Sequence, residues 1–245
     1  MPGHLSASQL SLYLSCGLAW SFRYVDGIAV PINGPIVRGK ALDEIANLHY
    51  RDKARGGLGL SLDEFTDGAG QNHDSVVENE EVTLDVSADE SKAMVRRAAA
   101  AYWKAIGSKL KPRSLQDVQR RWVVPLGDFE VVGYTDLIIT SGAVVDTKYR
   151  GRLAGGDRID RDVQLSTYSW LAGAEQLALA VATPEGKAQL MWTSRTPADV
   201  ERVKRLFTRA WAAIQNGVAV PAEPTSWRCT PAYCDFWDRC EVGGG

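Results

Sequence analysis

The chain has 245 residues, 45% of them hydrophobic, which is enough to bury a substantial core and excludes a disordered composition. Its formal net charge is -2, so no global basic field attracts nucleic acid, and any such contact has to come from local basic patches. No apolar stretch approaches the roughly 18 residues of a membrane span, and no signal peptide is recognisable at the N-terminus. We therefore expect a cytoplasmic protein without membrane contact.

The first half of the chain is predicted to be mainly helical. A capping box of Ser6 and Gln9 begins the first helix, which includes Cys16. The Gly- and Asp-rich stretch 51–71 is expected to form a mobile loop. The helices expected on either side of this loop from apolar spacing and capping residues cover residues 5–24, 35–50 and 88–110.

The second half of the chain alternates between strands and helices. Apolar, β-branched runs separated by short turns at Gly127 and Ser141 predict an antiparallel meander. Thr196 and Pro197 are typical of the start of a last helix. The expected strands cover residues 118–126, 129–140, 142–150, 177–183 and 188–194, and the expected helices cover 163–178 and 198–217. Together these elements predict one α/β domain over residues 1–245, with helices around a central mixed sheet.

Ionisable residues interrupt the predicted hairpin between the second and third strands. Asp146 and Lys148 are two residues apart on one strand and point to the same face, and the hairpin brings Asp136 within reach of Asp146. Two neighbouring carboxylates repel unless a proton or a cation lies between them, and Mg²⁺ or Mn²⁺ suits oxygen ligands. Lys148 would hold a water or a phosphate oxygen, as phosphodiester hydrolysis requires. The alternative is an exposed strand edge that carries ordinary surface charges.

Four cysteines form the second group of candidate ligands. Disulfides are not expected in a reducing cytosol, whereas four thiolates complete either one tetrahedral metal site or one iron–sulfur cluster. One cysteine lies near the N-terminus, and three lie in a Pro-rich tail that is expected to be irregular. They are Cys16, Cys229, Cys234 and Cys240.

The hairpin resembles the core of PD-(D/E)xK nucleases of the RecB-like exonuclease branch. In that branch a Gly-x-x-Asp strand, here ending at Asp136, precedes an acidic-x-Lys strand, here Asp146 to Lys148. A Gln-x-x-x-Tyr motif on the following helix is matched by Gln164 and Tyr168. The resemblance implies that these five residues are catalytic and that the enzyme is a divalent-metal-dependent deoxyribonuclease, specifically an exonuclease.

The same resemblance extends to both chain ends. The iron–sulfur subset of the branch, which includes the AddB nuclease domain and CRISPR-associated RecB-like exonucleases, holds a 4Fe-4S cluster with one N-terminal and three C-terminal cysteines. Here the C-terminal spacing is C-x4-C-x5-C, which departs from the frequent C-x2-C-x5-C and favours a phage-type relative. The resemblance implies a clasp formed by residues 1–30 and 221–245 around a nuclease core, 31–220. A structural zinc is the competing interpretation.

One position departs from the branch pattern. The usual histidine ligand of the second helix is replaced by Asp43, in the stretch "RGKALDEIA". An aspartate there still suits a hard cation, so Asp43, Asp136 and Asp146 are the expected metal ligands. The replacement also keeps open an alternative function, a catalytically silent DNA-binding or recruitment subunit that retains the nuclease fold.

A basic patch beside the proposed metal is expected to contact phosphates of single-stranded DNA or DNA ends. Its members, grouped by their nearness to Lys148 in the sequence, are Arg150, Arg152, Arg158 and Arg161. The chain has no Gly-rich phosphate loop followed by Lys and Ser or Thr, so an ATP-driven motor would be another chain. A helicase, a recombination protein or a CRISPR adaptation protein is the kind of partner that this implies.

Overall fold

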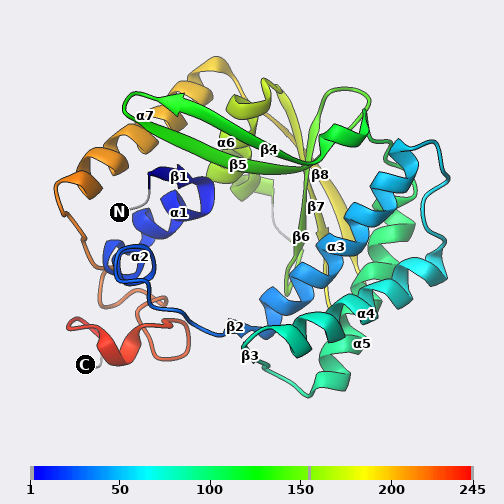
Figure 1. The fold of residues 1–245 in the computed structure, drawn as a ribbon, viewed down its shortest axis with the longest axis horizontal. Helices are drawn as coiled ribbons and strands as arrows, with labels where there is room; N and C mark the ends of the chain where they lie inside the picture. The colour runs from blue at the N-terminus through cyan, green and yellow to red at the C-terminus, as the bar shows by residue number, and fades with distance from the viewer. Residues whose placement is uncertain (1–2, 154–155, 244–245) are drawn as a thin grey trace. The chain divides into compact units, whose positions relative to one another are not determined.

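The computed structural model of the chain describes residues 3–153 and 156–243, apart from the side chains of residues 156–158 (Figure 1). Its internal contacts divide the chain into two compact units, which are described separately. The terminal unit consists of Met1–Val30, Val123–Gly133 and Pro197–Gly245. The central unit consists of Pro31–Trp122 and Tyr134–Thr196. No helix in the described ranges is long and apolar enough to cross a membrane.

A mixed β-sheet forms the middle of the central unit. In spatial order its strands are the second half of β5 (Phe129–Ile138), then β6 (Val144–Tyr149), β7 (Gln176–Ala182) and β8 (Ala188–Ser194). The pairs β5–β6 and β7–β8 are antiparallel, and β6–β7 is parallel. A parallel pair needs a crossover connection, and this one contains α6 (Val163–Ala172).

Helices cover both faces of this sheet because β6 and β7 are apolar on both sides. Val145 and Ala178 pack into a core shared with the helices that precede the sheet, whereas Val144 and Leu177 pack with Leu165 of α6. The helices of the first layer, which lie together in Figure 1, are α3 (Gly34–Ala54), α4 (Leu62–Asn79) and α5 (Ala88–Tyr102). The α/β class with a mixed sheet flanked by helices, predicted from the sequence, is thereby confirmed.

Several short elements complete the central unit. Strand β4 (Val118–Leu126), of which residues 118–122 belong to this unit, pairs with β5, and β2 (Ile32–Asn33) pairs in parallel with β3 (Val82–Thr83). The short helices are the π-helix η1 (Trp103–Gly107) and the 3-10 helices η2 (Leu115–Asp117) and η3 (Gly156–Arg161). The helix expected over 88–110 is therefore α5 followed by a π-helical turn.

The expectation of a mobile loop over 51–71 is wrong. α3 continues to Ala54, and α4 begins at Leu62. Ser61 and Glu64 form a capping box that stabilises the first turn of α4, and Phe65 of that turn is fully buried. The Gly and Asp content favoured a loop, although the sequence also contained the capping box and the apolar spacing of a helix.

The helix expected over 163–178 is also shorter than predicted. α6 ends at Ala172 because Gly173 adopts φ 64°, a left-handed conformation that glycine allows without steric cost. The following residues enter β7 at Gln176, where the apolar run is fully buried in the sheet. Leu177 therefore lies in a strand rather than in the helix, because its side chain is buried in the sheet.

The terminal unit is built around a short strand and three helices. β1 (His4–Ser6) pairs in parallel with the start of β5. The helices are α1 (Ala7–Ser15), α2 (Gly17–Tyr24) and α7 (Pro197–Gln215), and the tail contains the 3-10 helix η4 (Trp237–Arg239). Ser6 caps α1 through the predicted capping box with Gln9.

Cys16 does not lie within a helix, which corrects the sequence-based expectation. Its backbone is extended, with φ -165° and ψ 105°, and it separates α1 from α2. Its N–H donates to the carbonyl of Leu12 at the end of α1, and its Sγ accepts from the N–H of Ala19 in α2. The residue therefore caps both helices.

Candidate active site

Asp136 and Asp146 lie on neighbouring strands at the predicted hairpin. The antiparallel register pairs Leu137 with Val145, so the two aspartates come next on β5 and β6. Asp146 is 1% exposed, and the Oδ2 of Asp136 accepts a 2.8 Å hydrogen bond from the N–H of Thr147. The hairpin thus holds a buried and a half-buried carboxylate side by side rather than two exposed surface charges.

Lys148 forms an ion pair with Asp146. Its Nζ donates to Oδ1 at 3.0 Å and lies 2.9 Å from Oδ2 without a suitable hydrogen-bond geometry. Within the described residues, the buried Oδ2 accepts no hydrogen bond. Burial alone would lower the pKa of Lys148, but the carboxylates of Asp146 and Asp136 together outweigh it and raise that pKa. Lys148 therefore carries a positive charge at neutral pH.

The carboxylates of this site hold protons more tightly than ordinary aspartates do. Burial, followed by the charges of Asp146 and Asp43, raises the pKa of Asp136 well above its usual range. Burial also raises the pKa of Asp146, although Lys148 opposes that change. Burial raises the pKa of Asp43 to about 6, although the positive charge of Lys148 lowers it in part. Poor solvation is the largest cause of all three shifts, and neighbouring carboxylates add to it.

Gln164 and Tyr168 reach the site from α6. The side-chain cap of Asp162 on the N–H of Leu165 fixes the first turn of this helix, which carries Gln164. The Nε2 of Gln164 donates to Asp146 at 3.2 Å and to the hydroxyl of Tyr168 at 2.7 Å. Tyr168 is 5% exposed, and burial raises the pKa of its phenol. The structure therefore brings the predicted Gln-x-x-x-Tyr pair to Asp146.

Asp43 reaches the same site from α3, together with two residues that sequence reasoning missed. Asn47, one turn later, donates to the Oδ2 of Asp43 at 3.3 Å. Gln119, at the start of β4, donates to Asp43 at 3.1 Å and is 3.5 Å from the Oδ1 of Asp136. The i,i+4 spacing after Asp43 was a readable signal for Asn47, whereas nothing in the sequence singled out Gln119.

The donor set of this site fits a hard divalent cation. Three carboxylates supply oxygen ligands: that of Asp146 is buried, and those of Asp43 and Asp136 are half-buried. One oxygen of Asp146 accepts no hydrogen bond from the described residues. In the part of the chain that the structure describes, however, no three His, Cys, Asp or Glu side chains are arranged to hold a metal ion. The oxygens of Asp43 and Asp136 are instead engaged by protein donors, including Gln119 and the N–H of Thr147.

The predicted basic patch is described in part. Arg152 and Arg161 are exposed, and Arg150 is half-buried at the end of β6. The positive charge of Arg150 lowers the pKa of Asp146 and so opposes the increase that burial causes. Arg150 therefore contributes to the electrostatics of the site. The side chain of Arg158 lies outside the described residues.

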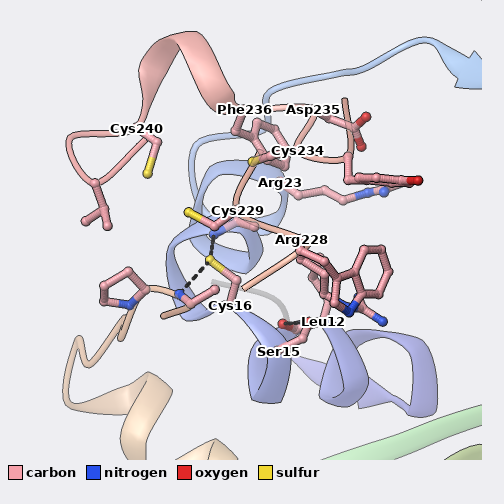
Figure 2. Close-up of a pocket in the computed structure, with 16 residues that line it drawn as sticks. Leu12, Ser15, Cys16, Arg23, Arg228, Cys229, Cys234, Asp235, Phe236 and Cys240 are labelled. Atoms are coloured by element: carbon pink, nitrogen blue, oxygen red, sulfur yellow. Dashed lines mark hydrogen bonds between the residues drawn. The ribbon is translucent and has the colours of Figure 1, made fainter. Parts of the chain in front are cut away.

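The four cysteines lie in the terminal unit, where they line one cavity of about 270 Å³ (Figure 2). All four are free thiols, and Cys240 is buried. The Sγ of Cys16 also accepts a 3.4 Å hydrogen bond from the N–H of Ala222 in the tail. Burial is the main cause of a raised pKa at Cys234, and the other three cysteines add to the increase. A hydrogen bond from the backbone of Phe236 lowers this pKa in part. The four cysteines thus line one cavity, but in the described part of the chain no three of these side chains are arranged to hold a metal ion.

A mixed sheet flanked by helices, with carboxylates and a lysine on neighbouring strands, defines the restriction-endonuclease-like class of α/β proteins. The sequence model of the PD-(D/E)XK nuclease superfamily matches residues 4–241. The chain therefore belongs to the PD-(D/E)XK nuclease superfamily.

Two solved structures are similar to the chain. One is named "Putative exonuclease" from Eubacterium rectale, with a TM-score of 0.50 and 12% identity over 93% of this chain and 87% of that one. This likeness shows a shared fold. The other is SSO0001, with a TM-score of 0.38 and 25% identity over 51% of this chain; the matched part spans 58% of SSO0001. No curated protein matches the chain in sequence.

Proposed function

We propose that the protein is a divalent-metal-dependent deoxyribonuclease, specifically an exonuclease that acts on single-stranded DNA or DNA ends. The observation that carries this proposal is the cluster of the buried Asp146 with the half-buried Asp43 and Asp136 beside Lys148. Lys148 compensates one of these three neighbouring carboxylates, and the others repel each other unless protons or a cation lie between them. Because the chain belongs to a nuclease superfamily, we propose that a cation rather than protons compensates the carboxylates in the active protein.

The three aspartates would hold Mg²⁺ or Mn²⁺, the ions that members of this superfamily typically use. The bound ion would supply charge for the phosphate oxygens and lower the pKa of a water. Asp146 is the central ligand in this proposal because it is buried and its Oδ2, 2.9 Å from the Nζ of Lys148, accepts no hydrogen bond from the described residues.

Lys148 and Gln164 prepare the site for water and substrate. Lys148 stays protonated because its pKa is raised, so it acts as a donor and a positive charge rather than as a base. In this proposal it holds the attacking water and one phosphate oxygen. Gln164 fixes the orientation of Asp146, and its hydrogen bond to Tyr168 fixes Gln164 in turn.

Arginines near the site would bind the DNA backbone. Arg152 and Arg161 are exposed, and Arg150 already influences Asp146, so phosphates beside the reacting bond are the contacts we propose for them. Arg158 is proposed to contribute in the same way from its place in the sequence. A separate helicase, recombination or CRISPR adaptation protein would supply any ATP-driven movement along DNA.

The cavity lined by the four cysteines is proposed to hold a structural 4Fe-4S cluster. Four thiolates are the complete ligand set of such a cluster, and the cavity brings together the sulfurs of Cys16, Cys229, Cys234 and Cys240. The proposal extends to the RecB-like branch with an iron–sulfur clasp, since one N-terminal and three C-terminal cysteines match the arrangement of that branch, although the C-x4-C gap departs from its frequent C-x2-C spacing. A zinc ion is the competing occupant.

A cleavage assay tests the nuclease proposal. Asp146→Asn and Asp136→Asn keep the size of each side chain and remove a charge, so Mn²⁺-dependent shortening of end-labelled single-stranded DNA should fall by at least a hundredfold. Asp128→Asn, the same substitution in the exposed β4–β5 turn, should leave cleavage unchanged.

Two outcomes contradict the proposal. Full cleavage by a folded Asp146→Asn protein would place the chemistry elsewhere. If the unsubstituted protein binds DNA in Mn²⁺ but cleaves neither single strands nor ends, it is instead a catalytically silent DNA-binding subunit, the alternative function that the aspartate at position 43 suggested.

A further inference from the structure

Gln119 has an unusual backbone for a residue in a strand. Among the described residues, it is the one non-glycine residue with a positive φ, at 55°. This left-handed conformation brings Cβ too close to the backbone and is unfavourable for any residue except glycine. Unfavourable conformations of this kind persist where surrounding interactions stabilise them, and they concentrate at functional sites.

The side chain of Gln119 shows which interactions stabilise this conformation. Its Nε2 lies 3.3 and 3.1 Å from the two carboxylate oxygens of Asp43 and 3.2 Å from the Oδ1 of Asn47. The Oδ1 of Asp136 follows at 3.5 Å, the longest of the four contacts. One amide nitrogen is therefore surrounded by oxygens from three side chains on α3 and β5.

The arrangement matters because the charges of this site are unevenly compensated. Lys148 pairs with Asp146, whereas the amide of Gln119 is the donor that Asp43 and Asp136 share. An amide carries only a partial positive charge, but two N–H groups reduce the repulsion between carboxylates. A cation bound by Asp43 and Asp136 would need the same oxygens.

We infer that Gln119 is a positioning residue whose amide occupies the space between Asp43 and Asp136 in the metal-free protein and competes with the divalent cation. This inference rests on the proposed cation site. When the cation binds, the amide has to leave its position, and its hydrogen bonds to Asp43 are lost. Gln119 thus holds the carboxylates in place before metal binding and weakens the affinity for the metal.

Metal binding and metal-free stability test this inference without an activity assay. Gln119→Met has a side chain of similar length without donors, and Gln119→Gly also removes the unfavourable left-handed conformation. Gln116→Met, the same change at an exposed position of η2, is the matched control. Calorimetric titration with Mn²⁺ gives Kd, and thermal unfolding in EDTA gives the stability of the metal-free protein.

We expect Gln119→Met to bind Mn²⁺ about tenfold more tightly, since the lost hydrogen bonds to charged groups no longer oppose binding. Its Tm in EDTA should fall, because Asp43 and Asp136 then lack their shared donor. Gln119→Gly should also bind more tightly and lose less Tm, because glycine accepts a positive φ. Gln116→Met should match the unsubstituted protein in both measurements.

Two results overturn the inference in distinguishable ways. If the unsubstituted protein binds Mn²⁺ and Gln119→Met binds it equally or more weakly, the competition is refuted and the cation site stands. If neither protein binds Mn²⁺, the cation site itself is refuted, and the inference falls with it. Binding by Gln119→Met alone would support the competition in its strongest form.

Discussion

At the scale of single residues, the site depends on how burial changes the protonation of its carboxyl groups. Asp43 illustrates this: burial is the largest influence, and Lys148 and Asn47 oppose it only in part, so its pKa is about 6. The folded protein therefore holds a proton on Asp43 over a pH range in which the unfolded chain has released it. A cation has to displace this proton, so metal binding should weaken as the pH falls below about 6.

The first prediction at this scale concerns the stability of the metal-free protein. The pKa of Asp43 is about 6 in the folded protein and 3.8 for an ordinary aspartate. The stability gained from this group is therefore complete below the lower pKa and lost as the pH rises through the upper one. Asp43→Asn removes this titration. Unfolding in EDTA between pH 4 and pH 7 should therefore show a shallower decline for Asp43→Asn than for the unsubstituted protein. Parallel pH profiles of the two proteins would contradict the raised pKa.

At the scale of secondary-structure elements, the junction between α1 and α2 is held against the C-terminal tail. The N–H of Gly17 donates to the carbonyl of Val220 at 2.6 Å, and the hydroxyl of Tyr13 donates to the carbonyl of Val218 at 2.7 Å. The Sγ of Cys16 accepts from Ala222 in the same tail. These bonds attach the tail to both helices before any metal group is considered.

Gly17 gives a prediction for this junction. A Cβ added there would lie 2.7 Å from the backbone nitrogen of Val220, and backbone atoms cannot move aside as a flexible side chain would. Gly17→Ala should therefore lower the free energy of unfolding by roughly 1–3 kcal/mol, the usual cost of overpacking. Gly3→Ala, where no atom lies within 4 Å of the added Cβ, should have little effect. Denaturant unfolding of both variants measures the difference, and equal stability would show that the tail does not pack on α2.

At the scale of the whole molecule, the terminal unit brings together cysteines that are far apart in the chain. Cys16 and Cys229 are separated by 213 positions (229 minus 16), and both line the cavity in Figure 2. A metal group held by both ends would close a loop of this length. If the loop-closure entropy of disulfides applies to a metal clasp, it would stabilise the fold by about 5 kcal/mol.

Metal analysis tests the proposed clasp. Anaerobic preparations should contain four irons and four sulfides per chain, and Cys16→Ala should lose both together with a large part of its Tm. Ser11→Ala, an exposed substitution in α1, should retain the iron and the Tm. One zinc without iron would replace the cluster by a zinc clasp. Full metal content in Cys16→Ala would exclude Cys16 as a ligand.

The sequence by itself determined the parts of the protein that depend on local patterns. Apolar periodicity and turn residues predicted the α/β class, and the spacing of Asp136, Asp146 and Lys148 predicted one polar cluster on a hairpin. The i,i+4 spacing of Gln164 and Tyr168 placed both on one face of α6. In each case the controlling geometry, the strand or helix repeat, spans only a few residues.

Only the tertiary structure decided which distant residues join that cluster and how their charges are compensated. Gln119 enters the site through a left-handed backbone conformation that no local preference favours, and its partners lie on other elements. The burial of Asp43, which raises its pKa, likewise depends on the packing of α3 within the central unit. Cys16 leaves the expected helix because its backbone and Sγ interact with both adjoining helices and with the tail. Contacts between residues far apart in the chain override local propensity at these positions, because burial and hydrogen bonding there outweigh the small differences in local preference.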